Sequence, residues 1–370
     1  MSIRAGSRRS VLPFAITAER RLEVPRWLPL VTTVGALGVA LLISGILITL
    51  IGGDPIASFG HILVSSFGSV GVLSDTLVKA TPLIFTGLAC ALAFRMRLWN
   101  IGAEGQFYVG AWGASAIVLA PIVPSGSPAF VTIPLMVIAG FAAGAVWGFI
   151  AGWLRARVNV NEIITTLMLN YVAILWVQFW VFGPWSEGGF QLSKQFPKEA
   201  WLPRLTDLTN VVAAFSGLTV HLGLAFGLVA ALLVWFVLKR TRKGYEIRLI
   251  GDNAQAARYA GVNISRNIVL VMLVSGGLAG LGGMSEVGGA VHRLQDSISP
   301  GYGFTGVIIA YLAKFNPLYV VIAAIAFGAL ILAGREIQPA GIPSMIQGVI
   351  LFCVIASDVL LRYRVRVARR

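Results

Sequence analysis

The chain has 370 residues, of which 57% are hydrophobic and only 12% are charged, and its mean hydropathy is +0.83. Soluble domains carry about twice that charged fraction, so the composition excludes a soluble protein and indicates a polytopic membrane protein. Lysines and arginines concentrated at the chain ends and beside apolar segments account for the net charge of +14. This distribution is the positive-inside bias of membrane insertion, so we expect no nucleic acid partner.

Ten apolar segments are candidates for membrane helices, since a helix needs about 20 apolar residues to cross a bilayer. They cover residues 28–51, 76–95, 104–122, 131–154, 162–183, 213–238, 267–288, 303–314, 317–334 and 343–361. An even number of crossings places both termini on one side, which the charge distribution indicates to be the cytoplasm. The segment 303–314 is too short to cross upright, so we expect a half-helix shielded from lipid. The predicted fold is an all-α polytopic membrane protein of about ten transmembrane or half-membrane helices.

The predicted organisation has three parts. A cytoplasmic basic arm covers 1–27, a transmembrane domain covers 28–361, and a cytoplasmic basic tail covers 362–370. The longest outer loop is expected at 184–212, either as a docking surface for a soluble partner or as a solvated connector. A polar, positively charged inner loop is expected at 239–266.

Glycines four residues apart mark two of the predicted helices. They are Gly140, Gly144, Gly148 and Gly152 in one segment, and Gly276 and Gly280 in another. Small residues at this spacing let helix backbones approach closely, so that packing replaces the hydrophobic drive between helices. We therefore expect a densely packed bundle.

A polar run, Asn100-Ile-Gly-Ala-Glu-Gly-Gln106, separates the second and third predicted helices. Its glycines permit a sharp turn, and a helix that restarts near Glu104 would place its amides and dipole beside that carboxylate. A carboxylate at membrane depth needs a partner or water. Asn100, Glu104 and Gln106 are therefore expected either to form a capped, satisfied turn or to line a substrate path.

A second polar group begins the predicted helix 162–183. Asn161 is a good N-cap, and Glu162 in the first turn favours the helix dipole. Thr166 and Asn170 lie four residues apart on one face of the same apolar helix. Polar residues in that position either bridge helices or line a cavity, and Glu162, Thr166 and Asn170 are candidates for the substrate path.

The remaining charged residues near the outer ends of helices have simpler interpretations. Asp75 and Lys79 are one helical turn apart, which predicts a local ion pair. Glu286 and His292 lie near the outer end of the seventh segment, where they are expected to be solvated or to contact a docking protein.

No catalytic constellation is evident. The sequence contains no phosphate-binding loop of the GxxxxGK[ST] type and no Cys/His metal spacing. We predict that this chain is not an enzyme, holds no metal or cofactor, and does not hydrolyse ATP itself.

The inner loop carries the most informative pattern. Asp252 or Asn253 can cap a short helix over Ala254–Ala260, and Gly261 can end that helix in the left-handed conformation. The alanines give the helix a shallow surface that can seat in another protein's groove, with Arg248 and Arg258 able to reach acids around it. The alternative is an ordinary cytoplasmic loop.

The run Gln255-Ala256-Ala257, followed after three residues by Gly261, resembles the E-A-A-x-x-x-G coupling signature of ATP-binding-cassette (ABC) importer permeases. The longer run GYEIRLIGDNAQAARYAGVN is similar to that loop in the branched-chain amino acid and simple-sugar permeases. AFRMRLWNIGAEGQFYVGA (93–111) and NVNEIITTLMLNYVA (159–173) resemble the subgroup that works with basic-membrane-protein-type nucleoside-binding lipoproteins. Gln255 stands where the family usually has Glu, so the resemblance does not carry over that residue's ion pair.

The resemblance implies a permease bundle of the large-cavity importer type in the bacterial inner membrane. It implies three partners: an ABC ATPase that binds ATP and magnesium, a second and related permease, and an extracytoplasmic lipoprotein that delivers nucleosides. It also implies that Asp252, Asn253, Gln255, Ala256, Ala257, Arg258 and Gly261 couple the ATPase to the bundle.

Two alternatives stay open. The substrate could be a simple sugar. The chain could instead be a secondary transporter driven by an ion gradient, with Glu104 and Glu162 as the coupling carboxylates.

Overall fold

The computed structural model describes residues 14–21, 25, 27–120, 122–124, 126–209, 212–334 and 341–369. Seven helices in this part are long and apolar enough to cross a membrane, and three shorter ones are apolar as well. The long spans are Val31–Leu50, Val70–Arg95, Ala129–Val158, Glu162–Phe182, Leu222–Arg240, Ile264–Val291 and Ile342–Leu361. The short apolar helices are Pro55–Phe67, Tyr302–Leu312 and Pro317–Ala333. The predicted all-α polytopic fold is confirmed.

The complete order of helices is as follows: α1 Leu28–Leu50, α2 Pro55–Phe67, α3 Val70–Arg95, α4 Ala103–Leu119, α5 Ala129–Val158, α6 Glu162–Phe182, α7 Leu222–Arg240, α8 Arg242–Asp252, α9 Ala254–Tyr259, α10 Ile264–Ser285, α11 Tyr302–Leu312, α12 Pro317–Ala333 and α13 Ile342–Arg362. A π-helical turn, Glu286–Val291, extends α10, and three 3₁₀ turns lie at Lys198–Ala200, Leu205–Leu208 and Ala213–Phe215. Strand β1 (Phe14–Arg20) pairs antiparallel with β4 (Tyr363–Arg369), and β2 (Ser186–Glu187) pairs with β3 (Phe190–Ser193).

One predicted boundary is wrong, and one helix was not predicted. The predicted helix 213–238 begins only at Leu222, because His221 caps α7 and accepts a hydrogen bond from the Gly223 amide; a separate 3₁₀ turn lies at 213–215. Helix α2 is absent from the predicted segments, because its glycine, histidine and serines weaken its apolar signal. Asp54 caps α2 by accepting from the amides of Ile56 and Ala57, and Pro55 at the first helical position has no amide to satisfy.

The closest helix packing in the molecule joins α4, α5 and α10, and α3 also packs against α10. A Cβ atom at Gly144 would collide with the Gly276 carbonyl oxygen, and one at Gly280 would collide with the Gly140 carbonyl oxygen. The predicted glycine-mediated packing is therefore confirmed: backbones touch where side chains would otherwise separate them. Helix α3 is almost entirely buried, because α7, α10, α11 and α12 surround it.

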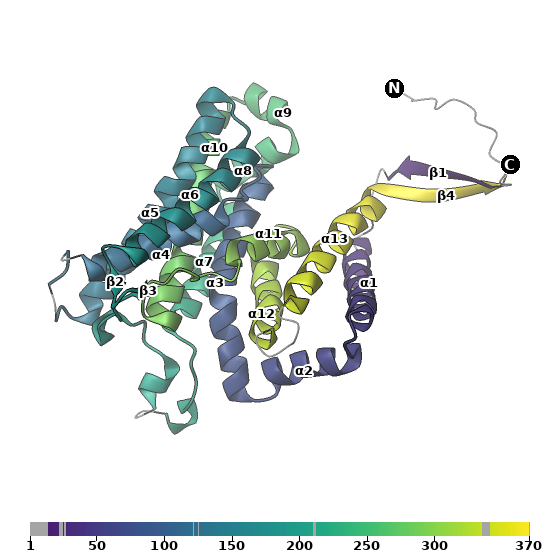
Figure 1. The fold of residues 1–370 in the computed structure, drawn as a ribbon. Helices are drawn as coiled ribbons and strands as arrows, with labels where there is room; N and C mark the ends of the chain where they lie inside the picture. Colours follow the sequence, from purple (N-terminus) through teal and green to yellow (C-terminus); the bar gives the residue numbers. More distant parts are fainter. Residues whose placement is uncertain are drawn as a thin grey trace.

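The two chain ends lie together at the edge of this bundle. Helices α1 and α13 pack against one another, and the β1–β4 pair continues from them (Figure 1). Figure 1 places this strand pair and α8–α9 toward the upper side of the molecule, while α2 and the loop after β3 lie toward the lower side. Residues 1–13 of the predicted basic arm lie outside the described residues.

Candidate functional site

Helices α8 and α9 fill most of the predicted inner loop. Asn253 is the N-cap of α9, and its Oδ1 accepts hydrogen bonds from the amides of Gln255 and Ala256 at 3.0 and 3.1 Å. Gly261 ends the turn with φ +75°, and its amide donates to the Arg258 carbonyl at 3.0 Å. The predicted short helix with its cap and left-handed end is confirmed to within one residue, and Asn253 rather than Asp252 is the cap.

The outward face of α9 differs from the prediction. Ala257 is completely buried, because α8 and α10 pack against α9. It therefore anchors the helix and cannot seat in another protein. The exposed residues around α9 are Asp252, Asn253, Ala254, Gln255, Arg258, Tyr259 and Ala260, of which Tyr259 is 93% exposed. The surface that α9 offers therefore mixes polar and aromatic side chains with two alanines, and Ala256 is only half-exposed.

Helix α8 holds α9 in place. It was not predicted as a helix of its own. Glu246 accepts hydrogen bonds from Lys243 at 2.7 Å and from Asn267 on α10 at 3.1 Å. The hydrogen bonds from Lys243 and Asn267 hold the pKa of this carboxyl below its usual range, so it is ionised at neutral pH. At the other end of α8, Gly251 lies so close to the Arg95 carbonyl that any side chain would collide with it. Movement of α9 would therefore be transmitted to α3 and α10.

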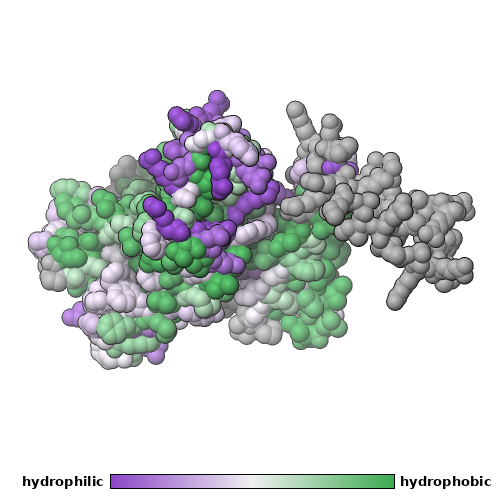
Figure 2. All heavy atoms as spheres, turned by 90° about the horizontal axis from the view of Figure 1, so that it is seen from above, coloured by the Kyte–Doolittle hydropathy of each residue, from purple (hydrophilic) through white to green (hydrophobic). Residues whose placement is uncertain are grey.

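Viewed from that side, the surface is divided by polarity. Figure 2 shows hydrophilic side chains gathered around one part of this face, with hydrophobic surface flanking it. The polar part contains the exposed residues of α8 and α9. This division is what a bundle with a lipid-facing belt and one polar end requires.

A second polar centre lies where the helix chain breaks inside the bundle. Asn100 donates from Nδ2 to Ser275 Oγ at 2.8 Å and to Gln106 Oε1 at 2.9 Å. Its Oδ1 accepts from the Gly102 amide at 3.0 Å and from Gln106 Nε2 at 3.1 Å. Asn170 on α6 accepts from the Gly105 amide and donates to the Ile101 carbonyl. Asn100, Gln106 and Asn170 therefore hold the turn that begins α4.

The N-terminal ends of α4 and α11 meet at this turn. Glu104, which is buried in the first turn of α4, accepts a hydrogen bond on Oε2 from the Gly303 amide at 2.6 Å. A side chain at position 303 would collide with the Glu104 backbone. Two positive helix ends thus face one carboxylate, and a backbone amide satisfies one of its oxygens. The short helix α11 starts beside other helices, as expected for a half-helix shielded by protein.

The two remaining path candidates lie at the start of α6. Glu162 Oε2 is 3.2 Å from Arg155 Nε, and Thr166 Oγ1 donates to the Glu162 carbonyl at 2.7 Å. Asn161 caps the helix by accepting from the Ile163 amide, as predicted. The geometry brings Asn100, Glu104, Gln106 and Asn170 together and gives each one a structural hydrogen bond. It also places the buried Thr166 against Gly102 of this turn, whereas Glu162 pairs with Arg155. A role of any of these residues in the substrate path stays a prediction.

The predicted Asp75–Lys79 ion pair is wrong. Lys79 Nζ lies 2.9 Å from Glu286 Oε1 and 3.2 Å from the Tyr302 hydroxyl, while Asp75 accepts from Thr219 Oγ1 at 2.6 Å. Lys79 faces the buried side of α3, and the π-helical turn brings Glu286 inward to meet it. Glu286 is 2% exposed, so the expectation of a solvated residue is also wrong. The sequence offered one clue to this pair, since Lys79 and Glu286 are charged residues in otherwise apolar segments.

The outer loops form one connected surface. The amides of Ser193, Phe196 and Leu202 donate to the carbonyls of Leu294, His292 and Gly288, in that order. The part of the loop from Ser193 to Leu202 is therefore tied to the segment after α10, while most of the described loop residues are exposed. A docking role of this loop stays a prediction.

A histidine centre lies within this surface. His292 is buried, stacks on Trp201, and accepts from Arg204 Nη2. Burial, reinforced by the Arg204 guanidinium, lowers the pKa of His292 to about 4 and that of His221 to about 3. Both histidines are therefore neutral at pH 7, and the expectation that His292 is solvated is wrong.

This arrangement defines a class: a multi-pass helical membrane protein with broken helices in its interior and a rigidly mounted polar helix at one end. Residues 72–355 match the family described as branched-chain amino acid transport system / permease component. The chain belongs to this family of ABC transporter permeases.

Individual relatives cover nearly the whole chain. The glucose ABC transporter permease protein TsgB13 of Haloferax volcanii is 35% identical over 94% of this chain and 93% of its own length. The guanosine ABC transporter permease protein NupP of Bacillus subtilis is 33% identical over 87% of this chain and 92% of its own length. The nucleoside ABC transporter permease protein NupB of Lactococcus lactis is 32% identical over 85% of this chain and 86% of its own length.

Proposed function

We propose that this chain is the transmembrane permease subunit of an ABC importer for nucleosides in a bacterial inner membrane, with both termini in the cytoplasm. Its family membership and the capped, exposed α9 are the observations that carry the proposal. In this scheme the chain itself is not catalytic. A separate ATPase binds ATP and magnesium, and its closure moves α9.

The mechanism follows from how α9 is mounted. Because Ala257 is buried and Glu246 ties α8 to α10, a push on α9 displaces α8 and the ends of α3 and α10. Helices α3 and α10 carry the Lys79–Glu286 pair, and Ser275 of α10 accepts a hydrogen bond from Asn100 in the turn before Glu104. A rearrangement there would alternate access between the two sides of the membrane.

Two further partners complete the proposal. A second, related permease would form the other half of the pathway, as the resemblance of the NIGAEGQ run implies. A substrate-binding lipoprotein would dock on the outer surface, where the loop 184–212 and the segment after α10 form one hydrogen-bonded platform. Substrate specificity would lie mainly in that lipoprotein.

The nucleoside assignment is supported by the runs 93–111 and 159–173 and by the similarity to NupP and NupB. The similarity to TsgB13 favours a simple sugar as the second candidate. The two are separated by the cognate lipoprotein: we expect it to bind guanosine or adenosine in calorimetry and not glucose, galactose or ribose. If the lipoprotein binds a free sugar and no nucleoside, a simple sugar becomes the first candidate for the substrate.

An ion-coupled carrier fits the described residues less well. Glu104 and Glu162 would be its coupling sites, but the Gly303 amide and Arg155 already satisfy these carboxylates. We expect uptake to cease when ATP is depleted while the ion gradient is clamped. Persistent uptake under that condition would favour the carrier.

A further inference from the structure

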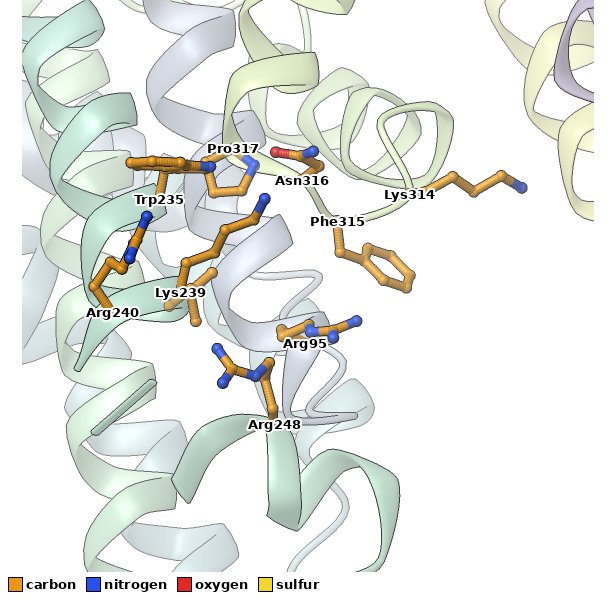
Figure 3. Close-up of a pocket in the computed structure, with 10 residues that line it drawn as sticks. Arg95, Trp235, Lys239, Arg240, Arg248, Lys314, Phe315, Asn316 and Pro317 are labelled. Atoms are coloured by element: carbon orange, nitrogen blue, oxygen red, sulfur yellow. The ribbon is translucent and has the colours of Figure 1, made fainter. Parts of the chain in front are cut away.

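A cationic cavity of about 600 Å³ lies beside α8, between the ends of α3 and α7 and the turn that joins α11 to α12. Ten residues line it: Arg95, Trp235, Leu238, Lys239, Arg240, Arg248, Lys314, Phe315, Asn316 and Pro317. Five of them are lysine or arginine, and none is acidic. Its size is within the range of small-molecule sites. Figure 3 shows Arg95, Lys239, Arg240 and Arg248 around the same space, with Lys314 directed away from it.

Three of the five cations of this cavity lack a carboxylate partner in the described part of the chain. No carboxylate there lies within ion-pair distance of Arg95, Lys239 or Arg248, whereas the neighbouring Arg242 and Lys243 pair with Glu246. Like charges gathered around one hollow repel each other and favour an anion between them. Guanidinium groups suit a phosphate in particular, because their forked donors match its oxygens.

The position of the cavity indicates what carries that phosphate. Helix α7 presents Leu232, Leu233 and Phe236 on its exposed surface, so it faces lipid up to the turn that reaches the cavity. Trp235 lies at the end of this apolar surface, where tryptophans anchor helices at the membrane interface. Lys239 Nζ lies 5.5 Å from the centre of the Trp235 ring, which fixes the lysine at the same depth. An acyl chain along α7 would place its headgroup at the cavity.

The turn that joins α11 to α12 forms one wall of the cavity, and this wall is rigid. Lys314 and Phe315 both have positive φ, 49° and 58°, a conformation that non-glycine residues keep only where neighbours impose it. The Phe315 ring packs against Phe94 and Tyr311, and Asn316 caps α12 by accepting from the Leu318 amide. The site is thus formed before its ligand arrives, which limits the ordering cost of binding.

From these observations we infer that the cavity binds the phosphate headgroup of an anionic membrane lipid such as phosphatidylglycerol. Arg248 belongs to α8, whereas Arg95 and Lys239 belong to membrane helices. The bound headgroup would therefore join α8 to the bundle and stiffen the mounting of α9.

The test is native mass spectrometry of the full-length chain, titrated with phosphatidylglycerol or phosphatidylcholine. Each cation contributes roughly a factor of five to binding of an anionic lipid. We expect Arg95→Gln/Arg248→Gln to weaken phosphatidylglycerol binding about 25-fold, and Lys239→Gln, at an exposed position, about five-fold. Phosphatidylcholine binding should be weak and unchanged.

The matched control removes two exposed arginines, Arg157 and Arg266, from an apolar-lined cavity beside α10. We expect Arg157→Gln/Arg266→Gln to leave phosphatidylglycerol binding within about a factor of two. Equal losses in both double variants, or no loss with Lys239→Gln, would overturn the proposal. So would displacement of the lipid by soluble glycerophosphoglycerol at equal concentration, which would assign the site to a free phosphate. Loss of the bound lipid when the ATPase is added would also overturn the proposal, because it would assign the cavity to binding of the ATPase.

Discussion

The buried Lys79–Glu286 pair gives the sharpest prediction about stability. Both side chains lie inside the bundle, 9% and 2% exposed, and the pair joins α3 to α10 at a point where α11 begins. Removal of one partner leaves an uncompensated buried charge, which costs about 3–5 kcal/mol. Replacement of both partners by apolar residues also removes the desolvation penalty, so the double variant should be about as stable as the original protein or slightly more stable.

We therefore expect Lys79→Met to destabilise the protein by about 3–5 kcal/mol. Glu286→Gln should cost about 1–3 kcal/mol, because the amide oxygen can still accept from Lys79. The double variant Lys79→Met/Glu286→Met should recover to within about 1 kcal/mol of the original protein. The assay is reversible unfolding in mixed micelles with increasing sodium dodecyl sulfate, followed by circular dichroism.

The same series contains its own control. Asp75→Asn changes a carboxylate on the same helix whose side-chain partner among the described residues is the Thr219 hydroxyl, so a change below about 1 kcal/mol is expected. Strictly additive effects of the Lys79 and Glu286 substitutions would refute the reasoning, since contacting charges must couple. A stable double variant that no longer transports would show that the pair serves the conformational cycle.

Three other predictions concern α9, the glycine packing and the outer histidines. Asn253→Ala removes the α9 cap at a cost of about 1 kcal/mol, so hydrogen exchange of the amides in 254–259 should accelerate about five-fold. Asp252→Asn, at an exposed position, should not change that exchange, and equal acceleration in both would contradict the capping argument. Gly144→Val drives a side chain into the Gly276 carbonyl and should abolish the monodisperse peak in size exclusion, whereas Gly348→Val, with open space around it, should not. The pKa of His292 is lowered in the fold, so its contribution to stability is complete above pH 6.5 and is lost as pH falls toward 4. Between pH 7 and pH 5 we expect the free energy of unfolding to fall by about 1–2 kcal/mol. The substitution His292→Gln should reduce this fall, whereas His61→Gln, at an exposed position, should leave it unchanged. The reverse pattern would contradict the assignment.

Much of the fold followed from apolar periodicity, because bilayer thickness sets helix length. The capped helix after Asn253 could be predicted as well, since a cap, alanines and a terminal glycine act within a few residues. The half-helix α11 was predictable from its length alone. These features depend on local interactions, which a sequence shows directly.

The features that could not be predicted depend on tertiary contacts. Lys79 had a carboxylate one turn away in sequence, yet the burial of its face of α3 directs it to Glu286 on a distant helix. Ala257 belonged to a pattern that suggested an exposed surface, but packing against α8 and α10 buries it. His221 and His292 are 71 positions apart and meet through Arg204, which no spacing rule connects.

The central claim is that α9 couples a separate ATPase to this bundle. The most direct test is site-specific cross-linking in the reconstituted transporter from position 259 of α9, where Tyr259 is 93% exposed and is replaced by a photoreactive amino acid. We expect a cross-link to the ATPase subunit, and uptake of nucleoside only when that subunit and ATP are present. Uptake by this chain without the ATPase, or cross-links from Tyr259 to lipid alone, would contradict the account.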